Sequence, residues 1–494
     1  MKLYFRFDLE FTYTFHAFAI WLKRDRQLRD EDFRGMVLGR LYYDYLANVQ
    51  TDIRYPHLST YQDLMWRAQT EPADREFLTR MEKTLDVDTL WRIFDSDRSI
   101  QHFSNEQALS ALTIFLKYFI EEFTTHRPDA VISFVTGNVS ALACYYVARH
   151  LGIPYLEFVA TRLQRRALVT TSPMNDFPEV EERYREFLAG RGDPESLREA
   201  EAYLAAFRTR PLSPDGLARF RALHERSVKL SPRRFLGWLR INYWWYFSHY
   251  RHDIATDPPI RQALNVLRMK LRQRKLRQPG FFERSLPADE PYVYFPLHYQ
   301  PELTTMVLAP FWQDQPSVIA NIARSLPLGI RLYVKEHVPM LGLRPVDYYD
   351  RLRAIPNVRL IDPYLSSLDL IQKSELVITI TGTAGFEAAL LRRPVIAFSD
   401  IFYNAMPGVQ RCRAPEDLPG FIREALASPP ADDRQVLAYV AALLDDTFEF
   451  DMDDLGFPER PFESVRDAPS TQRLYDAYMR VFNRVIGSAK LAHR

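Results

Sequence analysis

The chain has 494 residues, of which 47% are hydrophobic and 26% charged, and its formal net charge is +1. This length exceeds that of one ordinary domain, so we expect two domains with appendages, and the near-neutral charge gives no general attraction to nucleic acid. The two cysteines, Cys144 and Cys412, lie far apart in the sequence. We therefore expect neither a disulfide framework nor a cysteine metal site, and we expect a reducing, cytoplasmic compartment.

The N-terminal sequence and the hydropathy pattern predict neither a signal peptide nor a membrane span. Lys2, Arg6 and Asp8 interrupt the first apolar run, which a secretory signal would need intact. Nowhere do about 18 apolar residues follow one another, as a membrane helix would require.

The N-terminal half contains one predicted βαβ unit. MKLYFRF is a candidate first strand, and apolar residues at helical spacing predict a helix over 105–125. A strand at 130–135, a helix at 140–151 and a strand at 153–159 complete the unit.

Residues 178–285 differ in composition and are expected to form a helical insert. Charged helical segments come first, followed by an aromatic and basic stretch. Two prolines and a glycine make 278–290 a candidate linker. We therefore assign 1–285 to an N-terminal α/β domain that includes this insert.

The C-terminal half alternates strands with helices. The predicted strands are 292–297, 330–335, 358–361, 376–380 and 394–398, and the predicted helices include 306–325 and 384–391. This alternation predicts a parallel sheet in a Rossmann-like domain, which we place at 286–430 and follow by a helical tail at 431–494. Two α/β domains that face an interdomain cleft are typical of the GT-B fold, with other two-domain α/β folds as alternatives.

Three of these strands end in clusters of polar residues, and strand ends of a parallel sheet open onto one ligand crevice. Thr381, Gly382 and Thr383 lie between a strand and a helix, where free N–H groups and hydroxyls suit a phosphate. The alternative is that Thr383 only caps the helix.

The other two clusters add groups that neutralise or bind an anion or a sugar. Lys335 and His337 follow one strand, and His298, Gln300 and Glu302 follow another. A salt-bridged surface loop at 335–337 and a plain helix start at 301–302 are the alternatives.

The amino-acid sequence of the C-terminal half resembles that of the bacterial capsular polysaccharide biosynthesis family, which includes Kdo transferases that use a CMP-activated donor. The segments that carry the resemblance lie in order within 292–410: FPLHYQPE, VKEH with MLG and RP, PNVRLIDP, ITITGTAGFEA and RPVIAF. The resemblance implies a GT-B fold, a nucleotide-sugar donor in the C-terminal domain, CMP-sugars being favoured, and a role in surface glycan synthesis.

Four site residues come from the resemblance. The family's His-Pro nucleotide motif falls on His337, although Val338 follows it here and the proline comes at Pro339. Ser366 and Ser367 match a serine pair that binds donor phosphate, and Glu387 matches a carboxylate for donor hydroxyls. Helix caps and an ordinary helix carboxylate are the alternatives.

The N-terminal half is expected to supply the acceptor side. Candidates are Asn138, Arg162 and Arg166, because arginines suit an acidic glycan or a lipid phosphate; a solvated charged loop is the alternative. The sequence does not identify the catalytic residue, for which Glu157 and His337 are candidates. No metal is expected, because no Asp-x-Asp motif follows a strand, and Asp451-Met452-Asp453 reads as an acidic surface.

Residues 241–252 and 267–278 combine aromatic side chains with local positive charge. Such a segment can contact an anionic membrane surface, although a packed helical insert with a basic outer face is the alternative.

We therefore expect a metal-independent, cofactor-free GT-B glycosyltransferase of capsular or other surface polysaccharide synthesis, with Kdo from CMP-Kdo as one candidate donor. Its partners would be a nucleotide sugar and a glycan or glycolipid acceptor, without nucleic acid. A nucleotide-sugar epimerase of the same fold and a non-catalytic scaffold protein are the rivals.

Overall fold

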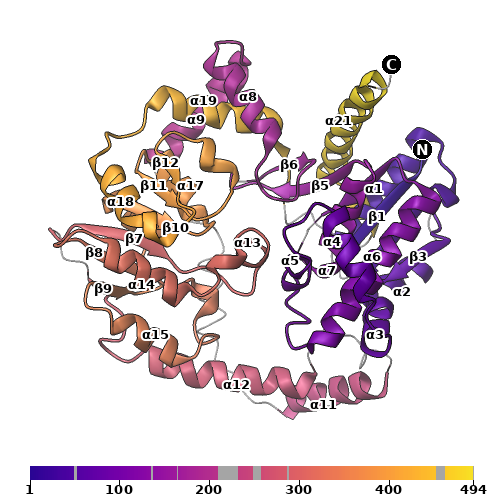
Figure 1. Cartoon of the computed structure of the whole chain (residues 1–494), viewed down its shortest axis with the longest axis horizontal. Coiled ribbons are helices and arrows are strands. Elements are labelled where there is room, and N and C mark those ends of the chain that lie inside the picture. Colours follow the sequence, from indigo (N-terminus) through magenta and orange to yellow (C-terminus); the bar gives the residue numbers. More distant parts are fainter. Residues whose placement is uncertain are drawn as a thin grey trace. The chain divides into compact units, whose positions relative to one another are not determined.

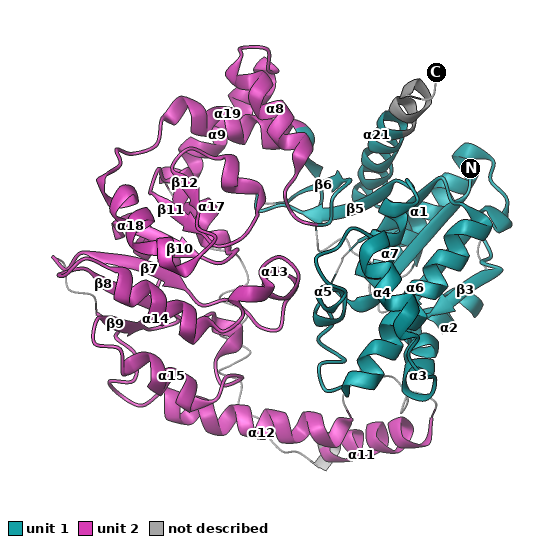
Figure 2. Cartoon of the chain, in the orientation of Figure 1, with its two compact units in different colours: residues 1–173, 249–256, 446–494 teal, residues 174–248, 257–445 magenta. Residues whose placement is uncertain are grey.

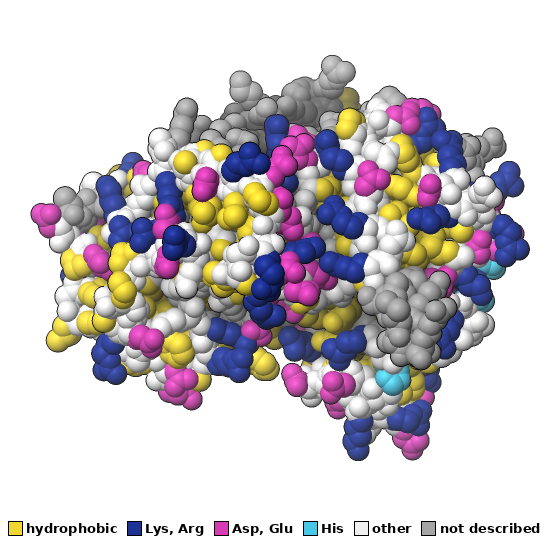
Figure 3. All heavy atoms as spheres, turned by 90° about the horizontal axis from the view of Figure 1, so that it is seen from above, with side chains coloured by type: hydrophobic (Ala, Val, Ile, Leu, Met, Phe, Trp, Pro, Cys, Tyr) yellow, Lys and Arg dark blue, Asp and Glu magenta, His cyan; other side chains and the backbone are white. Residues whose placement is uncertain are grey.

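The computed structural model describes residues 1–9, 11–48, 53–134, 137–163, 165–209, 232–248, 258–285, 289–451 and 462–492. The chain forms two compact units, one from residues 1–173, 249–256 and 446–494 and the other from residues 174–248 and 257–445 (Figure 2). Lys and Arg side chains are interspersed with Asp and Glu over the face drawn in Figure 3.

The first unit is built on a sheet that is parallel in its centre (Figure 1). Its strand order is β13-β6-β5-β4-β1-β2-β3, with β5 and β13 each antiparallel to β6. The strands are β1 (Leu3–Asp8), β2 (Phe33–Leu38), β3 (His57–Thr60), β4 (Ala130–Ser133), β5 (Tyr155–Ala160), β6 (Arg166–Thr170) and β13 (Phe448–Glu449).

The helices of the first unit include the predicted one, which is α6 (Asn105–His126). The strand β4, the helix α7 (Val139–His150) and the strand β5 form the predicted βαβ unit. The other helices are α1 (Phe11–Arg26), α2 (Arg40–Asn48), α3 (Tyr61–Thr70), α4 (Arg75–Thr84), α5 (Trp91–Asp95), α20 (Phe462–Arg466) and α21 (Pro469–Ala492).

The second unit contains a fully parallel sheet with the strand order β12-β11-β10-β7-β8-β9. Counted from β7, this is the Rossmann order 6-5-4-1-2-3. The strands are β7 (Tyr292–Pro296), β8 (Arg331–Lys335), β9 (Val358–Ile361), β10 (Leu376–Thr379), β11 (Val395–Ala397) and β12 (Val409–Arg411). The prediction of two Rossmann-like α/β units is confirmed, whereas the cleft between them stays a prediction.

The helices of the second unit connect its strands and extend beyond its sheet. Those in the crossovers are α13 (Leu303–Met306), α14 (Gln315–Ser325), α15 (Val346–Arg353), α16 (Ser367–Lys373) and α17 (Thr383–Leu390). The others are α8 (Pro178–Leu188), α9 (Pro194–Thr209), α11 (Pro232–Phe247), α12 (Pro259–Leu276), α18 (Leu418–Ala427) and α19 (Asp433–Asp446).

The single helix expected over 306–325 is wrong. The chain instead forms α13, a short turn at 310–312 and then α14. Pro310 and Pro316 explain the division, because a proline lacks the N–H that a helix interior needs and is accepted only in a first turn, where both prolines lie.

The C-terminal residues, which the sequence placed in a separate tail, pack in two places. The helix α19 buries Val436, Tyr439 and Leu443 and falls almost entirely within the second unit. The helix α21 joins the core of the first unit through Leu474 and Tyr478. The Tyr478 hydroxyl donates to the Ser133 carbonyl of β4 at 2.7 Å, so that α21 covers one face of the first sheet.

We expect Leu474→Ala to destabilise the first unit, because the Leu474 side chain is only 1% exposed. A buried Leu→Ala change costs about 2–5 kcal/mol, which urea unfolding followed by circular dichroism would detect. Arg480→Ala, on the exposed side of the same helix, is the matched control and should change the free energy of unfolding by less than about 0.5 kcal/mol. Equal stability of the two variants would mean that α21 does not pack as described.

Candidate functional site

In the second sheet the strand order reverses between β7 and β10. These two strands are neighbours in the sheet although β8 and β9 come between them in the sequence. From this point the crossovers run outward in both directions, and the carboxyl ends of the two strands leave a place for a ligand. The loops that follow β7 and β10 hold His298 and Thr381. The candidate site is therefore built around these two loops.

His298 joins the two loops. Its Nε2 accepts a hydrogen bond from the Thr381 N–H at 3.2 Å and lies 3.2 Å from the Thr379 Oγ1, and its side chain is buried. An imidazole nitrogen that accepts from an N–H carries no proton, so the proton of the neutral ring lies on Nδ1. His298 thus acts as a structural acceptor that fixes the loop after β10.

The loop after β10 leads directly into α17. Gly382 is the residue before the helix, and no side chain caps this end; the alternative that Thr383 is the cap is therefore wrong, since Thr383 is the first helical residue. The Gly382 N–H donates to the Thr379 Oγ1 at 3.0 Å, and the Thr381 Oγ1 donates to the Thr304 carbonyl at 3.0 Å. The Thr381 hydroxyl is therefore engaged by α13, and Thr383 is the threonine that belongs to the first turn of α17.

Gln300 and Glu302 have different environments in the loop after β7. The Gln300 side chain donates to the Gln313 carbonyl at 2.8 Å and accepts from the Gln315 amide at 2.7 Å, so it holds the loop against the start of α14. Glu302 is exposed at the start of α13, where its carboxylate accepts from the Thr304 hydroxyl at 2.9 Å. A helix does start here, with Glu302 as the residue before it, whereas Pro301 lies outside the first turn in which it was expected.

Lys335, at the end of β8, extends toward the start of α16. Its Nζ donates to the Ser367 Oγ at 2.6 Å, and the side chain is buried. Burial lowers the pKa of Lys335 to about 8, although the carboxylates of Glu387 and Asp362 act in the opposite direction. The structure therefore brings Lys335, Ser367 and Glu387 together. Ser366 instead accepts from the Asp369 N–H at 3.2 Å and caps α16, as the plainer alternative expected.

A buried ion pair that the sequence analysis missed fixes the loop after β8. The Arg344 Nε donates to the Glu336 carboxylate at 2.8 Å, which also accepts from the Tyr349 hydroxyl at 2.7 Å. Arg344 donates as well to the His298 carbonyl and to the Gln300 Oε1 at 3.3 Å. One guanidinium thus holds the loops after β7 and β8 in place. The signal was the RP dipeptide at 344–345, which counted toward the resemblance but not toward the site.

His337 lies next to this pair, and its side chain is exposed to solvent. The surrounding protein atoms, together with the positive charges of Lys335 and Arg344, lower the pKa of His337. Its ring meets that of Tyr299 edge to face, with centroids 6.3 Å apart. At neutral pH the ring is mainly uncharged, so a hydrogen bond rather than a full charge is what it offers an anion.

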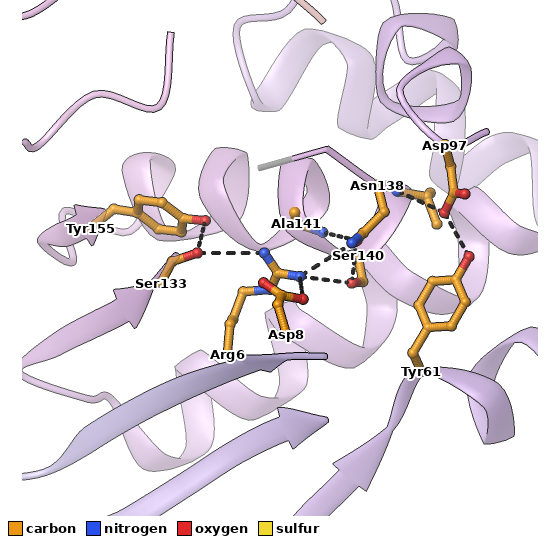
Figure 4. A network of polar contacts seen from close by, with 10 residues as sticks. Arg6, Asp8, Tyr61, Asp97, Ser133, Asn138, Ser140, Ala141 and Tyr155 are labelled. Atoms are coloured by element: carbon orange, nitrogen blue, oxygen red, sulfur yellow. Dashed lines mark hydrogen bonds and ion pairs between the residues drawn. The ribbon is translucent and has the colours of Figure 1, made fainter. Parts of the chain in front are cut away.

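The corresponding position of the first unit, between β1 and β4, holds a second polar network (Figure 4). The buried Arg6 of β1 pairs with Asp8 at 3.2 Å and donates to the Ser140 Oγ of α7 at 3.3 Å. The Ser133 hydroxyl of β4 lies 3.5 Å from the same guanidinium and accepts from the Tyr155 hydroxyl at 2.9 Å. Arg6 and Asp8 were noticed in the sequence only as charges that interrupt an apolar run, which was the available signal.

Asn138 belongs to this second network. Its Oδ1 accepts from the Ala141 N–H at 2.9 Å and from the Ser140 hydroxyl at 2.6 Å, so Asn138 caps α7. Nearby, Asp97 accepts from the Tyr61 hydroxyl at 2.6 Å and from the Val139 N–H at 3.2 Å. Burial raises the pKa of Asp97, and these hydrogen bonds oppose that rise.

The other acceptor-side candidates lie elsewhere along the sheet edge. Arg162 is exposed after β5, and Arg166 begins β6, where its backbone lies opposite Glu449 of β13 in the strand register. Glu157 is a buried residue of β5 and lies opposite Ser133 in the strand register. The network around Arg6 therefore contains Asn138 but neither arginine.

No group of three or more His, Cys, Asp and Glu side chains that could hold a metal ion occurs among the described residues. Within the same residues no helix has the length and hydropathy of a membrane span. Met452 and Asp453 of the Asp-Met-Asp sequence lie outside the described residues.

Comparison with known families supports the resemblance in the sequence. Residues 241–425 match the family described as capsule polysaccharide biosynthesis protein. The matched stretch includes the loops after β7, β8 and β10. No curated protein matches the chain.

Solved structures to which this chain is similar include glycosyltransferases and UDP-GlcNAc 2-epimerases. The beta Kdo 2,4 transferase KpsC of Thermosulfurimonas dismutans is 16% identical over 66% of this chain and 85% of that chain, with a TM-score of 0.35. The beta Kdo 2,7 transferase KpsC of the same organism is 11% identical. That match covers 80% of this chain and 97% of the other, with a TM-score of 0.37. The UDP-GlcNAc 2-epimerase of Methanocaldococcus jannaschii is 11% identical over 90% of this chain and 99% of that chain, with a TM-score of 0.28. At these scores nothing about the chemistry of this chain follows from the likeness.

We expect Gly382→Ala to disrupt the contact between the loops after β7 and β10. A Cβ on Gly382 would lie 2.7 Å from the Thr379 Oγ1 and 3.0 Å from the His298 Nε2, so both hydrogen-bonding groups must move. Thermal unfolding should therefore occur at a lower temperature. Gly420→Ala is the control, because nothing lies within 4 Å of a Cβ there and alanine stabilises a helix by about 0.5–1 kcal/mol relative to glycine. A Gly382→Ala protein as stable as the parent would contradict the described packing.

Proposed function

We propose that this chain is a glycosyltransferase of capsular or other surface polysaccharide synthesis and that it binds the phosphate of a nucleotide-sugar donor between the loops after β7, β8 and β10. The match of residues 241–425 to the capsule polysaccharide biosynthesis family supports the pathway. The observation that carries the binding site is the uncapped start of α17, held at the strand-order switch by His298.

The phosphate would be held by four groups of different kinds. The start of α17 supplies N–H groups and the positive end of the helix dipole, and the Thr383 hydroxyl supplies a further donor. The amine of Lys335 supplies a positive charge at neutral pH, since its pKa of about 8 keeps it protonated there. His337, at the rim, supplies a hydrogen bond to the leaving phosphate. These donors neutralise charge that develops on the phosphate as the sugar departs.

Donor hydroxyls would be bound by Glu387, next to Lys335. The acceptor would be bound by the first unit, where Asn138 is the candidate. Because the Asn138 Oδ1 already accepts from three donors, the Ser140 hydroxyl, the Ala141 N–H and the Arg6 guanidinium, a direct contact with the acceptor would come from its amide NH2 group. Arg162 and Arg166 would act on an acidic acceptor from the edge of the same sheet.

The cytoplasmic location, the absence of a catalytic metal and the preference for a CMP-sugar are parts of the proposal. A thermal-shift screen with CMP-, UDP-, GDP- and TDP-sugars tests the donor, since a ligand that binds the native state raises its apparent stability. Product analysis without an acceptor distinguishes the two enzyme classes, because an epimerase converts the sugar nucleotide alone. No stabilisation by any of these nucleotides would favour the scaffold alternative and contradict the proposal.

Thr383→Val should weaken nucleotide binding without unfolding the loop. The change keeps the shape of the side chain and removes one hydroxyl, and the loss of a hydrogen bond to a charged group costs about 1.5–3 kcal/mol. Isothermal titration calorimetry measures the effect, and His337→Ala provides a second variant. Thr304→Val is the matched control, since its hydroxyl donates to the exposed Glu302 instead. Unchanged affinity in both Thr383→Val and His337→Ala would place the nucleotide elsewhere.

The affinity for nucleotide should fall as the pH rises above the pKa of Lys335, which is about 8 in the free protein. A bound phosphate favours the protonated amine and raises this pKa, so binding takes up a proton at higher pH. The decrease should approach about tenfold per pH unit in this range. Lys335→Met should bind more weakly at pH 7 and lose the decrease. If the affinity of the parent protein is constant between about pH 7 and pH 10, Lys335 does not contact the phosphate.

A further inference from the structure

The helices α11 and α12 expose apolar side chains to an extent that the other described residues do not. Among the described residues, thirteen of the twenty exposed large hydrophobic side chains belong to these two helices. The most exposed on α11 are Phe247, Tyr243 and Leu236, at 77%, 68% and 65%. Concentrated exposure of this kind marks an interaction surface, whereas single exposed apolar residues are ordinary.

One side of α12 is anchored to the second unit. The Gln273 amide donates to the Leu341 carbonyl at 2.9 Å, and the Arg272 guanidinium donates to the Leu343 carbonyl at 2.6 Å. Leu276 belongs to the core of that unit. These residues fix which face of α12 is turned away from the protein.

The face opposite the anchor is an apolar stripe. Ile260, Leu264, Leu267 and Leu271 are all exposed, and their spacing of four, three and four residues places them within about 60° of one another around a helix. The stripe is continuous over three turns. A helix that only packs on its own protein would turn these residues toward the anchor.

Basic side chains border the stripe on both sides. At about 100° per residue, Arg268 and Lys275 lie along one border, and Lys270 and Arg274 lie along the other. The sequences of α11 and α12 contain no Asp or Glu. An apolar stripe between two basic borders suits an anionic lipid surface, because the leucines enter the acyl boundary while the long basic side chains reach the headgroups.

We propose that α11 and α12 form a docking surface for an anionic membrane. The charge complementarity decides between the possible occupants. A second copy of the chain that docked through the same face would bring two sets of basic borders together, which repel each other. An anionic bilayer offers the opposite charge over the whole length of both helices. This proposal does not depend on the nucleotide site and would hold for a protein that binds no nucleotide.

The test is co-sedimentation of the full chain with two kinds of vesicle. One is made of phosphatidylcholine alone, and the other is phosphatidylcholine with about 30% phosphatidylglycerol. Binding should increase with phosphatidylglycerol and decrease between about 0.05 and 0.5 M salt, because salt screens the attraction. The triple variant Arg268→Gln, Arg274→Gln, Lys275→Gln should lower the partition coefficient by about two orders of magnitude. Leu264→Ser, Leu267→Ser, Leu271→Ser should lower it on vesicles of either composition.

A matched control removes three exposed arginines from other helices of the same unit: Arg324→Gln, Arg423→Gln, Arg434→Gln. This control changes the net charge equally and should bind vesicles as the parent does. A second readout comes from Trp244, which is 52% exposed: its fluorescence should shift to shorter wavelength on anionic vesicles, and Trp244→Phe should remove that part of the shift. Thermal unfolding verifies that each variant is folded.

Three results would overturn the proposal. The first is that the parent protein fails to sediment with anionic vesicles. The second is that the control variant loses binding to the same extent as the triple variant in α12. The third is that light scattering shows a dimer that the three serine substitutions convert to a monomer, while vesicle binding is absent. This third result would assign the stripe to a second copy of the chain.

Discussion

The hydrogen bond from the Thr381 N–H to the His298 Nε2 joins two loops that are 83 residues apart in the sequence. The candidate site depends on this contact, because it fixes the start of α17 against the end of β7. The contact requires an unprotonated Nε2 and a residue without a side chain at position 382, where a Cβ would lie 3.0 Å from the same nitrogen. The glycine and the histidine are therefore two parts of one packing constraint.

A second constraint acts on the neighbouring loop. The pair of Arg344 and Glu336 is buried, and burial raises the pKa of Glu336 while Arg344 and the Tyr349 hydroxyl oppose that rise. A buried charge is tolerated only where its partners satisfy it. Since Arg344 also donates to the His298 carbonyl, the loops after β7, β8 and β10 form one connected network, and Lys335 and His337 lie along its border.

The two units repeat the same arrangement with different side chains. In each sheet the switch of strand order brings two strand ends together, β1 with β4 and β7 with β10. The first unit places the pair of Arg6 and Asp8 there, and the second places a neutral histidine. An arginine whose charge is already paired with a carboxylate attracts an anion less than an uncapped helix start beside a lysine does. This difference in charge supports a phosphate site in the second unit.

The sequence by itself determined the periodic features. The strand 358–361 was predicted with the bounds that the structure gives it, and the βαβ unit in the first half was predicted correctly, because apolar periodicity depends on neighbouring residues. For the candidate site, it predicted Lys335 and the 381–383 loop, since polar groups after apolar strands need no distant information. Only the tertiary structure decided which of these groups meet. Arg344 pairs with Glu336 from eight residues away, and α21 packs on strands more than 300 residues earlier in the chain. Contacts of this kind depend on strand order and burial, which local sequence patterns do not encode.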